Sequence, residues 1–155
     1  MPQVGSKAPD FTLLNTAREA VSLADYKGKT VVLVFYPGAF TGVCTNEMCA
    51  FRDSMADLNG LNANVLGISV DSTFANTGFA ERNNLEFPLL SDFNRDVIKN
   101  YGILLENFAG IEGYHVAKRS VFIVDGEGTV RYAWVTDNPG VEPNYDEVKE
   151  ELRKL

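Results

Sequence analysis

The sequence predicts a single α/β domain, in which helices cover both faces of a mixed central sheet. Residues 31–36 are apolar throughout and rich in β-branched side chains, as is typical of a strand buried on both faces. Runs of this kind alternate with helical periodicities. Two later strand runs are joined by Gly126-Glu127-Gly128, a hairpin signal that makes part of the sheet antiparallel. The chain has 155 residues, the size of one domain, so we expect one domain over residues 1–155.

The first half of the chain is expected to form a hairpin, a buried strand and a helix. Residues 11–16 and 21–23 flank a polar stretch, the pattern of a short hairpin. Pro37 and Gly38 end the buried strand. Over residues 41–58, apolar side chains recur at spacings of three and four, which predicts one continuous helix with one buried stripe. The stripe consists of Met48, Phe51, Met55 and Leu58.

The second half continues the alternation. Residues 64–70 are predicted as a buried strand, and residues 73–84 and 92–101 as two helices. A strand, a helix and a strand in this order imply a parallel, right-handed crossover. Residues 120–125 and 129–135 are the two antiparallel strands. Asn144, followed by Glu147, matches the start of a C-terminal helix.

Composition excludes several classes of partner. Fourteen basic and 21 acidic residues give a net charge of −7, which repels phosphate backbones and anionic lipid, so we expect neither nucleic acid nor a membrane as a partner. The longest apolar run is strand-sized. The first ten residues lack a secretory pattern, so a cytoplasmic location is expected, where a close cysteine pair is more often catalytic or metal-binding than structural.

The chemistry concentrates at Cys44, where a buried strand turns into a helix. The carboxyl ends of such strands are where open α/β sheets place their sites. If Thr41 is the N-cap, Cys44 falls among backbone N–H groups that lack an intrahelical acceptor, and these groups favour an anion. We therefore expect a raised thiolate fraction at Cys44, at the floor of a partly apolar pocket. The alternative is a small, inert core cysteine.

Pro37, Thr41 and Cys44 match the motif Pro-x-x-x-Thr-x-x-Cys, and the segment resembles the signature of the peroxiredoxins. The continuation Cys-Thr-x-Glu-x-Cys is similar to the bacterioferritin-comigratory (Q-type) and related subfamilies. The similarity extends over nearly the whole chain, through residues 5–11, 66–71, 87–92 and 119–125. It implies a thioredoxin-like fold with an N-terminal β-hairpin extension, and thiol-dependent reduction of hydrogen peroxide and organic hydroperoxides. No cofactor is expected.

The resemblance also implies roles for individual residues. Cys44 would be the peroxidatic cysteine, with Thr41, Pro37 and Arg119 completing its pocket and Glu47 as a supporting polar neighbour. A thiolate that attacks one peroxide oxygen pushes negative charge onto the other, so the site must stabilise charge at both ends. The rigid fork of Arg119 can hold both groups. Without this resemblance, the sequence favours a different interpretation of Arg119, as a solvated charge beside Lys118.

Cys49 leaves two mechanisms open. In an unbroken helix, five residues separate two Cα atoms by roughly 8.6 Å, beyond the roughly 7 Å limit of a disulfide. The resemblance implies local unwinding that lets Cys49 resolve the oxidised Cys44, with recycling by a thioredoxin- or glutaredoxin-type reductant. Alternatively, Cys49 is a spectator and an external thiol resolves Cys44.

Other functions compete less well. A disulfide oxidoreductase needs Cys-x-x-Cys, whereas four residues separate these cysteines. A non-enzymatic signalling or chaperone-like protein is the third class, and rapid oxidation of Cys44 would discriminate against it. His115 and Trp134 are expected to be structural, and no metal site is expected. The oligomeric state stays open, with a homodimer among the states considered.

Overall fold

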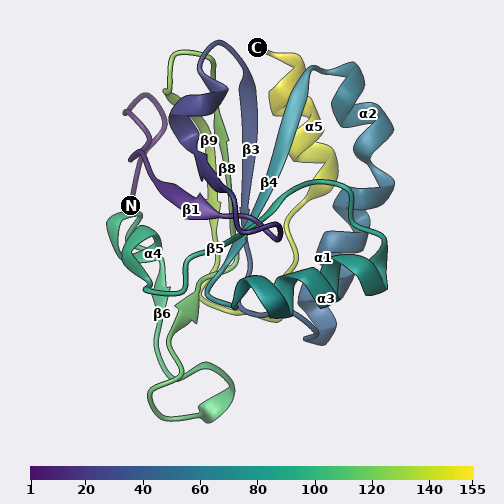
Figure 1. Ribbon diagram of the computed structural model, residues 1–155. Coiled ribbons are helices and arrows are strands. Elements are labelled where there is room, and N and C mark those ends of the chain that lie inside the picture. Colours follow the sequence, from purple (N-terminus) through teal and green to yellow (C-terminus); the bar gives the residue numbers. More distant parts are fainter.

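A seven-stranded mixed sheet forms the centre of the protein, in a computed structural model that describes residues 1–155 (Figure 1). The strand order is β2-β1-β5-β4-β3-β8-β9. Strands β3, β4 and β5 are parallel to one another, and the remaining pairs are antiparallel. The strands are β1 (Thr12–Leu14), β2 (Ala20–Ser22), β3 (Thr30–Phe35), β4 (Ala63–Ser69), β5 (Leu89–Ser91), β8 (Ser120–Val124) and β9 (Val130–Val135). The predicted mixed sheet is confirmed.

Helices cover both faces of this sheet, unequally. One face carries α1 (Gly42–Asp53), α2 (Met55–Gly60), α3 (Thr73–Asn83) and α5 (Tyr145–Arg153), which pack against Val32 and Val34 of β3. The other face carries α4 (Asp96–Asn100) and the small hairpin of β6 (Leu104–Leu105) and β7 (Val116–Ala117), and these pack against Leu33 and Phe35. Figure 1 shows the two groups on opposite sides of the sheet. Alternate residues of β3 thus enter two different cores, as expected of a buried central strand.

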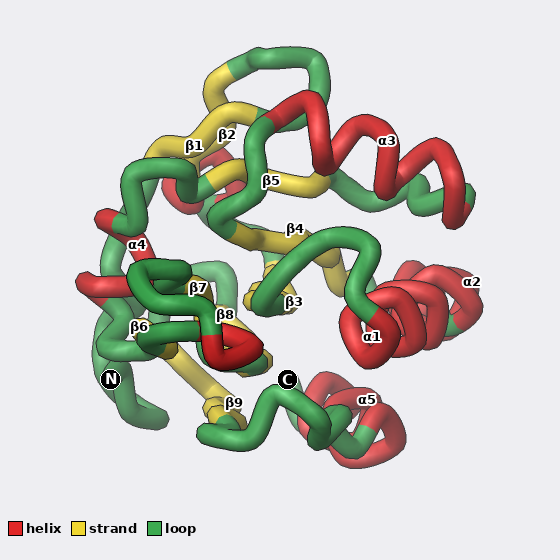
Figure 2. The backbone as a smooth tube through the Cα atoms, turned by 90° about the horizontal axis from the view of Figure 1, so that it is seen from below, coloured by secondary structure: helices red, strands yellow, loops and turns green.

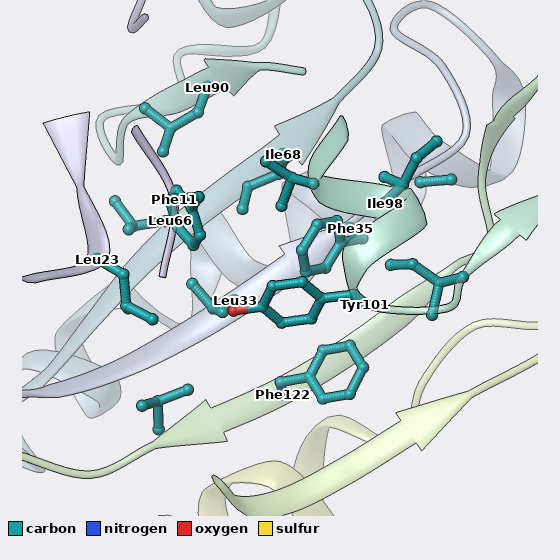
Figure 3. Packing of buried hydrophobic residues seen from close by; sticks show 14 of the residues in the cluster. Phe11, Leu23, Leu33, Phe35, Leu66, Ile68, Leu90, Ile98, Tyr101 and Phe122 are labelled. Atoms are coloured by element: carbon teal, nitrogen blue, oxygen red, sulfur yellow. The ribbon is translucent and has the colours of Figure 1, made fainter. Parts of the chain in front are cut away.

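Aromatic rings fill the core on the α4 side (Figure 3). The ring centroids of Phe35 and Tyr101 lie 5.3 Å apart, and those of Phe35 and Phe122 lie 5.9 Å apart at nearly a right angle. Tyr101 is fully buried, and its hydroxyl donates to the carbonyl of Pro9, which fastens the N-terminal segment to this core. Such edge-to-face contacts favour one packing arrangement and help to fix β3 and β8 as neighbours.

The predicted continuous helix over residues 41–58 is wrong. Ser54, with φ −90° and ψ −1°, separates α1 from α2. Serine competes for backbone hydrogen bonds and is a poor helix former, so a break at this residue costs little. The apolar period could not reveal the break because Phe51 and Leu58 are both buried on either side of it.

The helix predicted over residues 92–101 is shorter than expected, because Asp92 is buried ahead of it. The Asp92 carboxylate accepts hydrogen bonds from the backbone N–H groups of Val97 and Ile98, and Arg95 adopts a left-handed φ of 67°. Residues 92–95 therefore form a turn, and α4 begins at Asp96. The short strand β5 and the hairpin of β6 and β7 had no counterpart in the prediction, since strands of two or three residues carry too little pattern.

The connections that follow several strands meet at one end of the sheet. Seen from below, the loop after β3 leads into α1, and the loop after β9 and the loop between β6 and β7 lie at the same end of the sheet (Figure 2). None of the helices has both the length and the apolar character required to cross a membrane.

Candidate active site

Cys44 lies in the first turn of α1, directly after the loop that leaves β3. Thr41 is the N-cap residue by its backbone, with φ −83° and ψ 152°. The first helical hydrogen bond runs from Thr45 N–H to Thr41 O, and the N–H groups of Gly42, Val43 and Cys44 donate to no group of the chain. Cys44 is 0% exposed. Its thiol therefore lies beneath the surface, beside the positive end of the helix, as the sequence predicted.

Arg119 brings a cation to this thiol. Its Nη2 lies 3.2 Å from Cys44 Sγ, and the residue is 1% exposed. It directly precedes β8, and Ser120 pairs with Phe35 at the end of β3, so the antiparallel register places Arg119 beside the loop that carries Cys44. Arg119 is thus a component of the site, and the alternative of a solvated surface charge is wrong.

The guanidinium is held by two other acceptors. Its Nε and Nη2 both donate to the carbonyl of Pro139, at 3.2 and 2.8 Å, and Nη1 donates to Glu47 Oε1 at 2.8 Å. Burial opposes the charge, but the nearby Glu47 and Cys44 outweigh it and raise the pKa of Arg119. The fork is therefore charged and fixed in orientation before any substrate arrives.

Glu47 lies one turn after Cys44 and is fully buried. Burial raises its pKa from 4.5 to about 8, although Arg119 acts in the opposite direction; Glu142 adds to the rise. Its second oxygen, Oε2, has no hydrogen-bond partner. Burial therefore favours the neutral acid of Glu47 and opposes a full carboxylate charge beside Arg119, which leaves more of the Arg119 charge to the Cys44 sulfur.

Thr41 and Pro37 shape the loop above the thiol. Pro37 is buried and directly follows Tyr36, the residue after β3. The Thr41 side chain makes no capping bond to α1; instead its Oγ1 donates to Gly38 O at 2.8 Å. Thr41 is therefore the N-cap through its backbone alone, and its hydroxyl contributes no capping bond.

Cys49 lies in a different environment from Cys44, although both are free thiols on the same helix. Its Sγ lies 3.7 Å from Asn83 Oδ1, at the end of α3, and the side chain is partly exposed. Arg52 Nη1 donates to the Asn83 carbonyl at 2.7 Å and fastens the same part of α1 to α3. Because α1 is unbroken between the cysteines, the geometric separation argued from the sequence applies unchanged.

Two contributors to the site were missed by sequence reasoning. Pro139 supplies only its backbone carbonyl, which carries no sequence signal. Asp71 lies two residues after β4, and its Oδ2 accepts from the backbone N–H of Ala39 at 2.8 Å. A polar residue just beyond the carboxyl end of a buried strand is the signal that could have indicated it. His115 and Trp134 lie outside these contacts: His115 Nδ1 accepts from Asn107 N–H, and Trp134 packs partly buried against the core.

The arrangement can stabilise a thiolate and a second, developing negative charge. At the end of a mixed sheet covered on both faces, a sulfur at a helix start lies beside a buried arginine, and a threonine hydroxyl three residues earlier is held by the same loop. Together, this fold and this thiol define a thioredoxin-fold thiol oxidoreductase. Comparison with known proteins makes the assignment narrower. Residues 4–133 match the model of the AhpC/TSA family, and the chain belongs to this family.

Individual relatives agree with this assignment. A peroxiredoxin bcp of Coxiella burnetii is 42% identical over 132 residues, which cover 85% of this chain and 87% of that protein. Peroxiredoxin-2 of Bos taurus is 40% identical over 146 residues, or 88% and 70% of the two chains. The crystal structure of peroxidoxin BcpB from Mycobacterium tuberculosis matches with a TM-score of 0.87 at 28% identity, covering 100% and 99%. The peroxiredoxin resemblance and the thioredoxin-like fold are confirmed, and the protein is a peroxidase oxidoreductase.

Proposed function

We propose that Cys44 is the peroxidatic cysteine of a thiol peroxidase that reduces hydrogen peroxide and organic hydroperoxides. The thiolate attacks one peroxide oxygen, an S–O bond forms and the O–O bond breaks. Sulfur supplies the two electrons. The departing oxygen takes up the peroxide proton and leaves as water or an alcohol, and Cys44 remains as the sulfenate, which a proton from solvent converts to the sulfenic acid.

The 3.2 Å contact between Arg119 Nη2 and Cys44 Sγ is the observation that carries this proposal. A buried cation at this distance favours the thiolate and remains in place when negative charge develops on the leaving oxygen. The three unpaired N–H groups at the start of α1 act in the same direction. Glu47 orients Arg119, and the burial that raises its pKa lessens its competition for the Arg119 charge.

Cys49 completes the proposed cycle. Its thiol attacks the sulfenic sulfur of Cys44, an S–S bond forms, the S–O bond breaks, and water leaves. The first turns of α1 must open for this step, because the folded helix keeps the two Cα atoms too far apart. The resulting disulfide is then reduced by a dithiol of the thioredoxin type in the cytoplasm.

Intact mass after one equivalent of peroxide tests the proposal. We expect the unsubstituted protein to lose two hydrogens as the disulfide forms. Cys49→Ser should instead gain one oxygen, and Cys44→Ser should react at less than about one hundredth of the original rate. Cys49→Ser is the matched control for loss of a thiol from the same helix. Equal oxidation of both variants would contradict the assignment of Cys44. A gain of one oxygen by the unsubstituted protein, with no disulfide, would leave resolution to an external thiol.

A further inference from the structure

A single peptide group in the loop above Cys44 is held at both ends. The carbonyl of Gly38 accepts the hydrogen of Thr41 Oγ1 at 2.8 Å. The amide N–H on the other side of the same peptide, that of Ala39, donates to Asp71 Oδ2 at 2.8 Å. One peptide plane therefore connects the Thr41 hydroxyl to the Asp71 carboxylate.

This connection determines what Thr41 can do. A hydroxyl has one hydrogen and two lone pairs. With its hydrogen directed to Gly38 O, Thr41 Oγ1 has only lone pairs left for a second partner, so it can accept the hydrogen of a hydroperoxide that approaches Cys44. If the peptide rotated, the hydroxyl hydrogen would lose its acceptor, and Thr41 could turn as a donor toward the substrate. The orientation of the Gly38–Ala39 peptide thus selects the role of Thr41.

Asp71 is itself built into the scaffold rather than into the loop. Ser69, fully buried at the end of β4, donates from Oγ to Asp71 Oδ2 at 2.8 Å and accepts from the Asp71 N–H at 3.2 Å. Ser72, the next residue, is the N-cap of α3. Asp71 is therefore fixed by β4 and α3, both separate from the helix that carries the cysteine, and its second oxygen has no partner.

We propose that Asp71 is a positioning residue for the peroxidase reaction, which orients the Gly38–Ala39 peptide so that Thr41 Oγ1 accepts the hydrogen of the incoming hydroperoxide. The inference rests on the proposed role of Cys44. Asp71 acts through the peptide and through Thr41, and it does not touch the sulfur. Its effect belongs to the reaction with peroxide, not to the formation of the thiolate, which depends on Arg119.

Two substitutions at Asp71 separate positioning from charge. Asp71→Ala removes the acceptor of the Ala39 N–H. Asp71→Asn keeps a carbonyl oxygen for both Ala39 and Ser69, with its amide nitrogen in the place of the oxygen that has no partner. We expect the second-order rate of Cys44 oxidation to fall about 10- to 100-fold in Asp71→Ala and to stay within about threefold in Asp71→Asn. Equal losses in the two variants would assign the effect to charge and overturn the proposal.

Alkylation of Cys44 by iodoacetamide distinguishes positioning from a purely structural role. Structural damage at the site would change the alkylation rate as well as the peroxide rate. We expect the alkylation rate at neutral pH in Asp71→Ala to stay within about twofold, because Arg119 is intact, while the peroxide rate falls. A parallel fall of both rates, or an unchanged peroxide rate, would overturn the proposal. If Asp71→Ala unfolds in a thermal melt, the peroxide and alkylation rates of Asp71→Asn still test the proposal. A large fall of the peroxide rate in Asp71→Asn, which keeps both hydrogen bonds, would overturn it.

A double-mutant cycle with Thr41→Val tests whether Asp71 acts through Thr41. In the variant that combines Asp71→Ala with Thr41→Val, peroxide should oxidise Cys44 no more slowly than in Thr41→Val alone, because the hydroxyl through which Asp71 acts is already absent. Additive losses would contradict the proposed route. Failure of the unsubstituted protein to react with peroxide would instead refute the role of Cys44, and this outcome is distinct from all the others.

Discussion

The two cysteines of α1 differ more than their five-residue separation suggests. Cys44 is fully buried, lies 3.2 Å from a guanidinium nitrogen and sits among three unpaired backbone N–H groups. Cys49 is partly exposed, and its thiol donates to the neutral amide oxygen of Asn83 at 3.7 Å. Hydrogen-bond donors and a buried cation are therefore directed at the sulfur of Cys44, whereas the sulfur of Cys49 contacts a neutral amide oxygen and the arginine near it, Arg52, is partly exposed to solvent.

The comparison shows that one helix can hold two thiols in different electrostatic surroundings. The N-terminal turn supplies the electrostatics, and the next turn supplies a second thiol held against α3 by Arg52 and Asn83. Only a change in the helix can bring the two together. The folded helix thus keeps the two thiols apart, and the surroundings of each can be altered alone.

The largest expected difference is in the rate of Cys44 oxidation, when the arginine near Cys44 or the arginine near Cys49 is replaced. We predict that Arg119→Met slows oxidation of Cys44 by about 10²- to 10³-fold, because a fixed donor to the thiolate and to the developing charge is lost. Arg52→Met, the matched control near Cys49, should leave this rate within about twofold. Stopped-flow measurement of Cys44 oxidation in the two variants tests the prediction.

Arg119→Lys separates charge from geometry. It keeps a cation but cannot reproduce the fork that contacts Cys44, Glu47 and Pro139 together, so an intermediate rate is expected. Thermal unfolding of each variant checks that the fold is retained. Equal rates for Arg119→Met and Arg52→Met would show that the arginine beside Cys44 has no special role.

The next largest effect concerns the resolving step. We predict that Cys49→Ser retains rapid first oxidation but loses turnover with a thioredoxin-type donor and over-oxidises more readily. Oxidation of the unsubstituted protein should also increase amide hydrogen exchange between Thr41 and Cys49, as α1 opens. Gly42 and Thr45 are poor helix formers, which lowers the cost of opening. Continued turnover without Cys49, measured with the same donor, would favour the one-cysteine mechanism.

Most of the fold could be predicted because its main elements carry strong local patterns. The buried strand β3 is apolar throughout, and α3, β4, β8 and β9 lie where period and turn signals indicated. The errors came from tertiary context. Ser54 breaks a helix whose apolar period continues, and Asp92 pulls the chain into a turn by accepting two backbone hydrogen bonds.

In the candidate site, too, local sequence predicts some features, and others depend on tertiary structure. The place of Cys44 in the first helical turn follows from local sequence, because the strand, the loop and the N-cap are contiguous. Arg119 lies 75 residues away and reaches the sulfur only through the pairing of β3 with β8, so the family resemblance alone pointed to it. Asp71 and Pro139 act on the backbone or through it, and such contacts become visible only in three dimensions.

The smallest expected effect concerns Glu47, which lies between the two cysteines. Its pKa is raised to about 8 when folded and is 4.5 when fully solvated, so between these values the folded state holds one more proton than the unfolded state. The contribution of Glu47 to the free energy of unfolding therefore falls as pH rises from about 4.5 to about 8, and levels off above that.

Glu47→Gln removes this dependence, while its amide oxygen still accepts from Arg119. In a Cys44→Ser background, which removes the coupled thiol, the melting temperature of Glu47→Gln minus that of its parent should increase from pH 5 to pH 8.5. A decrease would mean that Glu47 is ionised and paired with Arg119 in the folded protein, so that the carboxylate competes with the thiolate for the same cation.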